Sequence, residues 1–208
     1  DQKVFFIHGP GGNGKSVFLR VLGEILGDYA VAAPLDAFLA SPGDRHPTDI
    51  ADFRGARLVT VAETEAGRRW AETRLKVMSG GDPVRARHLY RDFFEYVPQF
   101  KLIVAGNHKP EFREGGEAVR RRLQLIPFTV TIPESDRTLD LVDRLLEERD
   151  GILGWMIAGC ADWLKQGLAP PPAITRATEA YFRDEDRLQR WIDECCDLEP
   201  RASETIGA

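Results

Sequence analysis

Four short apolar runs divide the first two thirds of the chain, and each is followed at once by glycine or polar residues. They are rich in β-branched and aromatic residues and only a few positions long, which is typical of strands buried in a parallel sheet. Residues 30–56, which lie between the first and the second run, are mixed in character. The runs are residues 4–7, 57–62, 101–106 and 123–128.

After residue 138 the apolar residues follow helical spacing instead. We expect a three-layer α/β core with a central, mainly parallel sheet, followed by a small helical subdomain whose core contains Trp155, Trp163 and Trp191. Short helical pieces are also expected near residues 35–39 and 48–53. The expected divisions are a core over residues 1–133, a C-terminal helical subdomain over 134–200 and a tail over 201–208.

The first apolar run leads into residues 9–16, a complete G-x-x-x-x-G-K-[ST] phosphate-binding motif. Val17, Val21 and Ile25 then recur at helical spacing, so the loop lies between a strand and a helix, as the motif requires. Glycines let backbone N–H groups converge on phosphate oxygens, and the helix N-terminus favours negative charge. We expect Lys15 to reach the β- and γ-phosphates of ATP and Ser16 to ligate Mg²⁺. The expected nucleotide-binding residues are Gly9, Pro10, Gly11, Gly12, Asn13, Gly14, Lys15, Ser16 and Val17.

The second apolar run ends in Glu63-Thr64-Glu65. Because the carboxyl ends of parallel strands meet at one edge of a sheet, we expect these carboxylates beside the phosphates. One of them can hold the Mg²⁺ shell, for which Glu63 is the candidate, and the other can orient or deprotonate the attacking water. Which of Glu63 and Glu65 polarises water stays open.

Two further strand ends carry polar groups. Asn107 follows the third run and could sense the γ-phosphate or position water, although a lone Asn there is otherwise a turn residue. Arg121 and Arg122 precede the fourth run. In a ring ATPase an arginine must reach across a subunit boundary to stabilise transition-state charge, and this arginine cluster is the one so placed.

Residues 84–97 predict a β-hairpin with a short turn near Arg91-Asp92. Positive charge beside the ring of Tyr90 suits contact with a nucleic-acid backbone. On residue types alone, pairing of the arginines with nearby acids is equally favoured. The candidate contact residues in this hairpin are Arg85, Arg87, His88 and Arg91.

Composition narrows the setting of the chain. It is 43% hydrophobic and 29% charged with a net charge of −5, as in soluble globular proteins. We find no apolar run of membrane-spanning length, no secretory pattern and no metal or disulfide spacing among the three cysteines, so a reduced, cytoplasmic setting is expected. Residues 83–122 hold nine basic and five acidic residues, which hints at an anionic partner or a solvated charged face. The start at Asp1, just before the first strand, suggests a fragment.

The motifs in this order resemble the superfamily 3 helicase domain of phage and plasmid primase-helicases, the poxvirus-primase-like group. The resemblance covers about residues 4–128. Its five features are the glycine-rich loop 9–16, the acid-ended strand 61–65, the segment from Leu75-Lys76 through Gly80-Gly81-Asp82 to Arg87, the strand 101–107 with Pro110, and Arg121-Arg122 ahead of Pro127-Phe128.

This resemblance implies an AAA+-like P-loop ATPase core and a ring-forming, hexameric, ATP-driven DNA helicase that moves 3′ to 5′ on single-stranded DNA. It implies a sensor role for Asn107 and a trans-acting role for Arg121 or Arg122. It also places four residues toward a central channel, and it implies a phage-, prophage- or plasmid-encoded protein in a bacterial host. The channel residues are Lys76, Arg87, His88 and Arg91.

Two other functions use the same phosphate-binding motif. A ring ATPase that loads or remodels protein partners would hydrolyse ATP without responding to single-stranded DNA. A small-molecule P-loop kinase is disfavoured, because it leaves Asn107 and the arginine pair unexplained and no acceptor pocket is identifiable.

Overall fold

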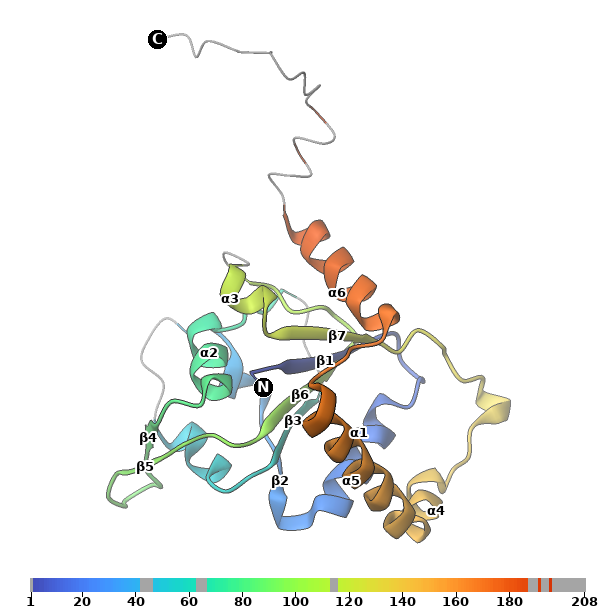
Figure 1. Ribbon diagram of the computed structural model, residues 1–208, viewed down its shortest axis with the longest axis horizontal. Coiled ribbons are helices and arrows are strands. Elements are labelled where there is room, and N and C mark those ends of the chain that lie inside the picture. Colours follow the sequence, from blue (N-terminus) through green and yellow to red (C-terminus); the bar gives the residue numbers. More distant parts are fainter. Residues whose placement is uncertain are drawn as a thin grey trace.

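A five-stranded parallel sheet forms the centre of the protein (Figure 1). The computed structural model describes residues 2–41, 47–62, 67–112 and 116–186, together with residues 191 and 195. The four apolar runs all form strands of this sheet, and the expected α/β class is confirmed. The strands are β1 (Val4–His8), β2 (Ala30–Ala32), β3 (Leu58–Ala62), β6 (Lys101–Gly106) and β7 (Leu123–Pro127).

Helices and a separate hairpin surround the sheet. The hairpin pairs β4 (Val84–Ala86) with β5 (Phe94–Tyr96) in antiparallel register. The short helical pieces expected before β3 are present as 3₁₀ turns, η2 (Leu35–Phe38) and η3 (Pro47–Phe53). The remaining elements are α1 (Lys15–Leu26), η1 (Gly27–Tyr29), α2 (Glu72–Gly80), α3 (Glu117–Arg120), η4 (Glu134–Asp136), α4 (Leu141–Glu147), α5 (Arg149–Gln166) and α6 (Pro172–Glu185).

The strand order is β2–β3–β6–β1–β7, so β6 lies between β1 and β3 although both precede it in the chain. In the ladders, Ala105 of β6 is level with Ile7 on one side and with Ala62 on the other. The carboxyl ends of β1, β3 and β6 are therefore neighbours at one edge of the sheet, at strand spacings of about 4.8 Å. Ligands of open parallel sheets bind at this edge.

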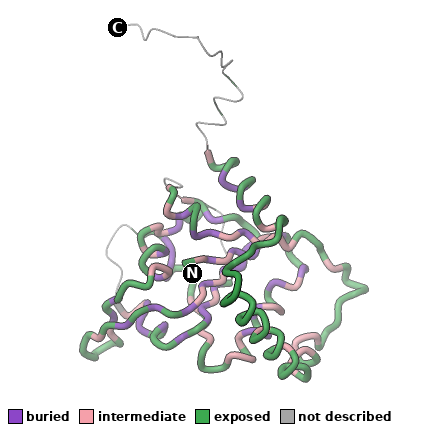
Figure 2. The backbone as a smooth tube through the Cα atoms, in the orientation of Figure 1, coloured by how far each residue is buried: buried purple, intermediate pink, exposed green. Residues whose placement is uncertain are grey.

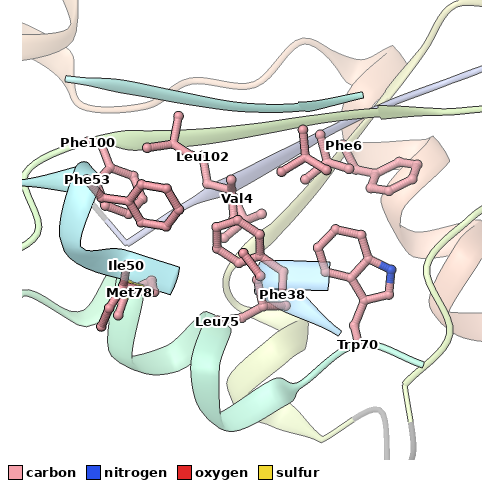
Figure 3. Packing of buried hydrophobic residues seen from close by; sticks show 14 of the residues in the cluster. Val4, Phe6, Phe38, Ile50, Phe53, Trp70, Leu75, Met78, Phe100 and Leu102 are labelled. Atoms are coloured by element: carbon pink, nitrogen blue, oxygen red, sulfur yellow. The ribbon is translucent and has the colours of Figure 1, made fainter. Parts of the chain in front are cut away.

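Alternate residues of β1 pack on opposite faces of the sheet, as strand geometry requires. Phe6 lies in the larger core, where the rings of Phe38 and Phe53 stack at 5.9 Å and Trp70 meets Phe6 edge-on at 6.3 Å (Figure 3). Ile7 lies in a smaller cluster with Leu19 of α1. Both faces of the central strand are thus buried, which explains its continuous apolar sequence.

Helix α6 packs against the edge strand β7. Tyr181 is almost wholly buried, and its hydroxyl donates to the Pro110 carbonyl. The Leu125 N–H of β7 donates to the Thr178 hydroxyl at 2.9 Å, and that hydroxyl donates to the Ile174 carbonyl at 2.8 Å. The helix therefore satisfies an outward N–H of an exposed sheet edge, where unpaired groups invite association.

The other two C-terminal helices differ from the expected bundle. Neither α4 nor α5 contributes a buried residue, whereas α6 belongs to the main core. The tryptophans expected inside are exposed, Trp155 by 68% and Trp191 by 56% (Figure 2 shows α5 as largely exposed). In the described part of the chain, no helix has the length and apolar character needed to cross a bilayer.

Candidate functional site

The glycine-rich loop, residues 9–16, connects the carboxyl end of β1 to the first turn of α1. Gly12 and Gly14 adopt φ of 69° and 84°, values that side-chain-bearing residues rarely adopt. Within the described residues, no backbone N–H from Gly11 to Ser16 donates to another backbone carbonyl. The first turn of a helix also leaves its N–H groups unpaired. The loop thus offers a set of free donors at a helix N-terminus, which is the arrangement that binds phosphate.

Lys15 lies inside this loop and is only 7% exposed. Its ammonium donates to the carbonyls of Gly9 and Pro10, each at 2.7 Å, and to Asn13 Oδ1 at 2.9 Å. These three bonds use all three donors of the ammonium. Burial lowers the pKa of Lys15 from its ordinary value. A phosphate that enters the loop therefore has to replace these oxygens as the hydrogen-bond acceptor of the ammonium.

The loop is fixed to the end of β7. Asn13 Nδ2 donates to the Phe128 carbonyl at 2.6 Å, and the Phe128 N–H donates to the His8 carbonyl at 2.7 Å. A Cβ on Gly9 would lie 1.8 Å from the Phe128 carbonyl oxygen, so this position requires glycine. The first glycine of the motif therefore serves strand packing, while the later ones shape the phosphate cradle.

Histidine and lysine side chains surround the loop at the carboxyl edge. His8 is half-buried, and its burial, followed by the charge of Lys109, lowers its pKa below 6.5. A hydrogen bond to the backbone of Asn107 opposes this effect only in part. His8 is therefore a neutral imidazole at pH 7 in a positively charged region. Sequence reasoning missed His8, because a histidine at a strand end carries no signal of its own.

Asn107 follows β6 directly and is exposed at the same edge as the loop. Glu63 and Glu65 lie outside the described residues, but Ala62 ends β3 beside Ala105 of β6. Ser16 is exposed in the first turn of α1. Among the described residues, no three His, Cys, Asp or Glu side chains form a group that could hold a metal ion.

Arg121 and Arg122 precede β7 and therefore lie at the opposite, amino edge of the sheet. β7 pairs in register with β1, from Leu123 beside Val4 to Pro127 beside His8. The length of this strand, four steps or about 13 Å, separates the arginines from the glycine-rich loop of the same chain.

The two arginines differ sharply in their surroundings. Arg122 is 6% exposed and donates to Gln2 Oε1 at 2.8 Å, the Ala118 carbonyl at 2.8 Å and Ser79 Oγ at 3.2 Å. Arg121 is exposed, and its hydrogen bonds in the described part of the chain use its backbone: the N–H donates to the Glu117 carbonyl at 3.0 Å and the carbonyl accepts from Lys3 Nζ at 2.6 Å. The structure thus disfavours Arg122 and favours Arg121 as a group that can reach another molecule.

The expected hairpin is confirmed, but its turn is centred on Leu89-Tyr90 rather than Arg91-Asp92. Tyr90 is 96% exposed at φ 58°, and the Arg91 N–H donates to the His88 carbonyl at 3.1 Å. The sequence signal failed here because several polar residues in a row can occupy a turn, and the backbone bond decides which of them do.

The arginines of the hairpin stack on aromatic rings. The guanidinium groups of Arg85 and Arg87 lie 4.2 and 4.8 Å from the centre of the Phe93 ring. His88 Nδ1 lies 3.5 Å from Asp52 Oδ1. Stacking holds the two guanidinium groups together at the surface, where they can also meet a phosphate backbone.

Lys76 and Arg91 complete the residues expected to contact DNA. Both are exposed, Lys76 on α2 and Arg91 at the hairpin turn. α2 leads into the hairpin through Gly81, but Lys76 itself lines a small cavity with Val119 and Arg122.

Residues 128–137 fold back over the glycine-rich loop, which sequence reasoning also missed. The Ile132 N–H donates to the Gly12 carbonyl at 2.8 Å, and Arg137 Nε donates to the Ile132 carbonyl at 3.1 Å. This segment shows neither strand nor helix periodicity, so no pattern pointed to it.

Residues 7–122 match the model of a protein family described as "Family of unknown function (DUF5906)". The chain belongs to this family. The DUF5906 match runs from the end of β1 to Arg122 and thus includes the glycine-rich loop, the hairpin and the arginine pair.

Two viral proteins are similar to this DUF5906 chain. It is 27% identical over 225 residues to "Putative helicase 022R" of Frog virus 3, across 99% of the chain and 23% of that protein. It is 26% identical over 213 residues to "Putative helicase L207/L206" of Acanthamoeba polyphaga mimivirus, across 92% and 22%. The chain therefore spans less than a quarter of the length of these relatives.

One solved structure supports the fold. The apo structure of the NrS-1 C-terminal region superposes with a TM-score of 0.57 at 17% identity, over 72% of this chain and 35% of that one. The fold of this chain is therefore shared with that structure over 72% of the chain.

Proposed function

We propose that this chain is the motor part of a helicase: a P-loop ATPase core of the superfamily 3 kind that hydrolyses ATP to move on single-stranded DNA. One observation carries the proposal. The buried Lys15 ammonium lies in a loop with free backbone N–H groups, at the carboxyl edge of the sheet. The names of the viral relatives support a nucleic-acid motor.

The described residues fit a nucleoside triphosphate. The loop N–H groups and Lys15 would hold the phosphates, with Asn107 beside the terminal phosphate at the end of β6. Mg²⁺ would be held by the Ser16 hydroxyl and Glu63 and would neutralise charge on the phosphate oxygens. Glu63 and Glu65 follow β3 in the sequence, next to this edge, and are the candidates for orienting the attacking water.

The position of Arg121 supports a ring. It lies a strand length away from the glycine-rich loop of its own chain, so any phosphate that it contacts would be bound by another subunit. We infer a homo-oligomeric ring, hexameric by the resemblance, in which the hairpin faces the DNA. Arg85, Arg87 and Arg91 would then contact the backbone phosphates.

The first test is the rate of ATP hydrolysis per subunit against protein concentration, with and without single-stranded DNA, for the wild type and Lys15→Ala. We expect a rate that rises with concentration and again with DNA, and no turnover by Lys15→Ala. Size measurement on the same samples reports assembly.

Other outcomes separate the alternatives. Turnover by an assembled sample that ignores DNA would favour a loader or remodeller of proteins. An active monomer would refute the ring and favour a small-molecule kinase. Turnover that survives Lys15→Ala would refute the assigned site itself.

A further inference from the structure

Arg137 lies against Gly12 of the glycine-rich loop, in the segment that folds back over this loop. A Cβ built on Gly12 would come within 2.7 Å of Arg137 Nη2 and within 3.7 Å of Thr131 Cγ2. The guanidinium is therefore in van der Waals range of the loop backbone. It reaches this position from 125 residues further along the chain.

Two hydrogen bonds hold it there. The Ile132 N–H donates to the Gly12 carbonyl, which ties the segment to the loop, and Arg137 Nε donates to the Ile132 carbonyl at 3.1 Å. The 3₁₀ turn Glu134–Asp136 reverses the chain between these two residues. The side chain is therefore oriented by its own segment and does not hang freely in solvent.

The positive charge of Arg137 is not neutralised by any carboxylate of the described residues. Some other exposed arginines do have such partners: Arg144 lies 3.1 Å from Asp140 and Arg68 lies 2.7 Å from Asp36. With Nε bonded to Ile132, the two terminal nitrogens keep four N–H donors for another acceptor. These donors stand beside the loop whose N–H groups are also free.

We propose that Arg137 is a second cationic ligand for the polyphosphate of a nucleotide bound in the glycine-rich loop, supplied by the same subunit as Lys15. This inference rests on the proposed nucleotide site and deepens it. Lys15 would contact the phosphates from within the loop itself, while Arg137 would contact them from the segment that folds over the loop. A guanidinium that binds phosphate through two parallel donors is a stronger and more directional ligand than an ammonium.

The same geometry explains the residue at position 12. Any side chain there would meet the Arg137 guanidinium and would also have to adopt φ 69°. Glycine at this position keeps the arginine in contact with the loop.

The test is equilibrium binding of ADP and of ATP to the full chain, by calorimetry at several salt concentrations, for Arg137→Gln, Arg137→Lys and the wild type. Arg144→Gln is the matched control, because it removes one exposed arginine from the neighbouring segment. We expect Arg137→Gln to weaken both nucleotides tenfold or more, with a shallower salt dependence. Arg137→Lys should bind more tightly than Arg137→Gln but less tightly than the wild type, because lysine restores the positive charge without the two parallel donors of the guanidinium.

Thermal unfolding of each variant separates binding from a purely structural role. If Arg137 only stabilises residues 128–137, Arg137→Gln would lower the melting temperature but would bind nucleotide with the same affinity as Arg144→Gln. That result would overturn the inference. Lys15→Ala distinguishes the two levels of the argument. If the wild type binds nucleotide, Lys15→Ala does not and Arg137→Gln binds normally, the inference fails while the proposed site stands. If the wild type binds no nucleotide, both fail.

Discussion

Alanine at position 122 is expected to destabilise the protein, whereas alanine at position 121 is not. Arg122 donates three hydrogen bonds from a buried position, and each such bond contributes about 0.5–1.5 kcal/mol net. Its removal also opens space beside Val4 and Leu123. We expect Arg122→Ala to lower the free energy of unfolding by about 2–4 kcal/mol, and Arg121→Ala to change it by less than about 0.5 kcal/mol.

Urea and thermal unfolding measure this difference directly. For a chain of this size, 1 kcal/mol shifts the melting temperature by about 2–4 °C, so Arg122→Ala should melt roughly 4–16 °C lower. Burial also lowers the pKa of Arg122, with a smaller contribution from Arg121, which shows that its charge is held at a cost. Equal unfolding of the two variants would refute the assignment of Arg122 to the interior.

The functional half of this prediction uses mixed assemblies. Arg121→Ala should lose ATP turnover although each subunit keeps Lys15, and Lys15→Ala should lose it although each keeps Arg121. Mixing the two inactive variants creates boundaries with one intact loop and one intact arginine, so part of the activity should return. Mixtures that stay inactive although they assemble would contradict a trans role for Arg121.

Three further outcomes are expected. Replacing Arg87 and Arg91 together by alanine should weaken binding of single-stranded DNA and reduce the slope of log K against log salt by about 1.4, while ATP turnover without DNA is kept. A double variant of arginines on α4 and α5 is the control. An equal loss of DNA binding in that control would contradict the assignment of the hairpin. Because the native pKa of His8 lies below 6.5, the unfolded chain binds more protons below that pH, so the free energy of unfolding should fall as the pH drops through 6.5 and stay level above it. Urea titrations at several pH values should show this fall reduced in His8→Asn, and an unchanged pH profile would refute it. Tyr181→Phe should cost about 1–3 kcal/mol in the same assay by leaving the buried Pro110 carbonyl unpaired, whereas a loss below 0.5 kcal/mol would contradict that bond.

The strands could be predicted because a strand that is buried on both faces of a sheet consists of consecutive apolar residues. Val59 and Val61 of β3 are fully buried, as are Val104 of β6 and Ile7 of β1. β2 was not predicted, because its three residues Ala30–Ala32 are only partly buried at the sheet edge and carry no run. The apolar pattern of a sequence reflects burial, so a partly exposed edge strand of three residues is hard to recognise from it.

The helical region shows the reverse error. Tryptophans at helical spacing predict a core, yet Trp155 and Trp163 of α5 are exposed. Apolar character states only that a side chain gains by leaving water. It does not state which element covers it, since that depends on the placement of α4 and α5 relative to the sheet.

For the candidate site, the loop was predictable and its surroundings were not. A phosphate-binding motif is local, because eight consecutive residues determine it. The contact of Asn13 with Phe128 joins residues 115 positions apart, and the contact of Arg137 with Gly12 is equally remote. Neither is visible in local spacing, and both depend on β7 lying directly beside β1.

The topology places the glycine-rich loop and the arginine-bearing hairpin toward opposite edges of the sheet. The glycine-rich loop and Asn107 lie at the carboxyl ends of β1 and β6, whereas Arg121 precedes β7 and the hairpin ends at Tyr96, just before β6 begins (Figure 1). Arg121 and the hairpin are thus attached to the amino edge, and the glycine-rich loop lies at the carboxyl edge. If Arg121 stabilises charge on a neighbour's phosphates, the strands of the sheet, which run from one edge to the other, are the rigid connection between that boundary and the loop. A motor built in this way would need at least two subunits for each turnover, and this is why concentration dependence, rather than activity alone, is the decisive observable.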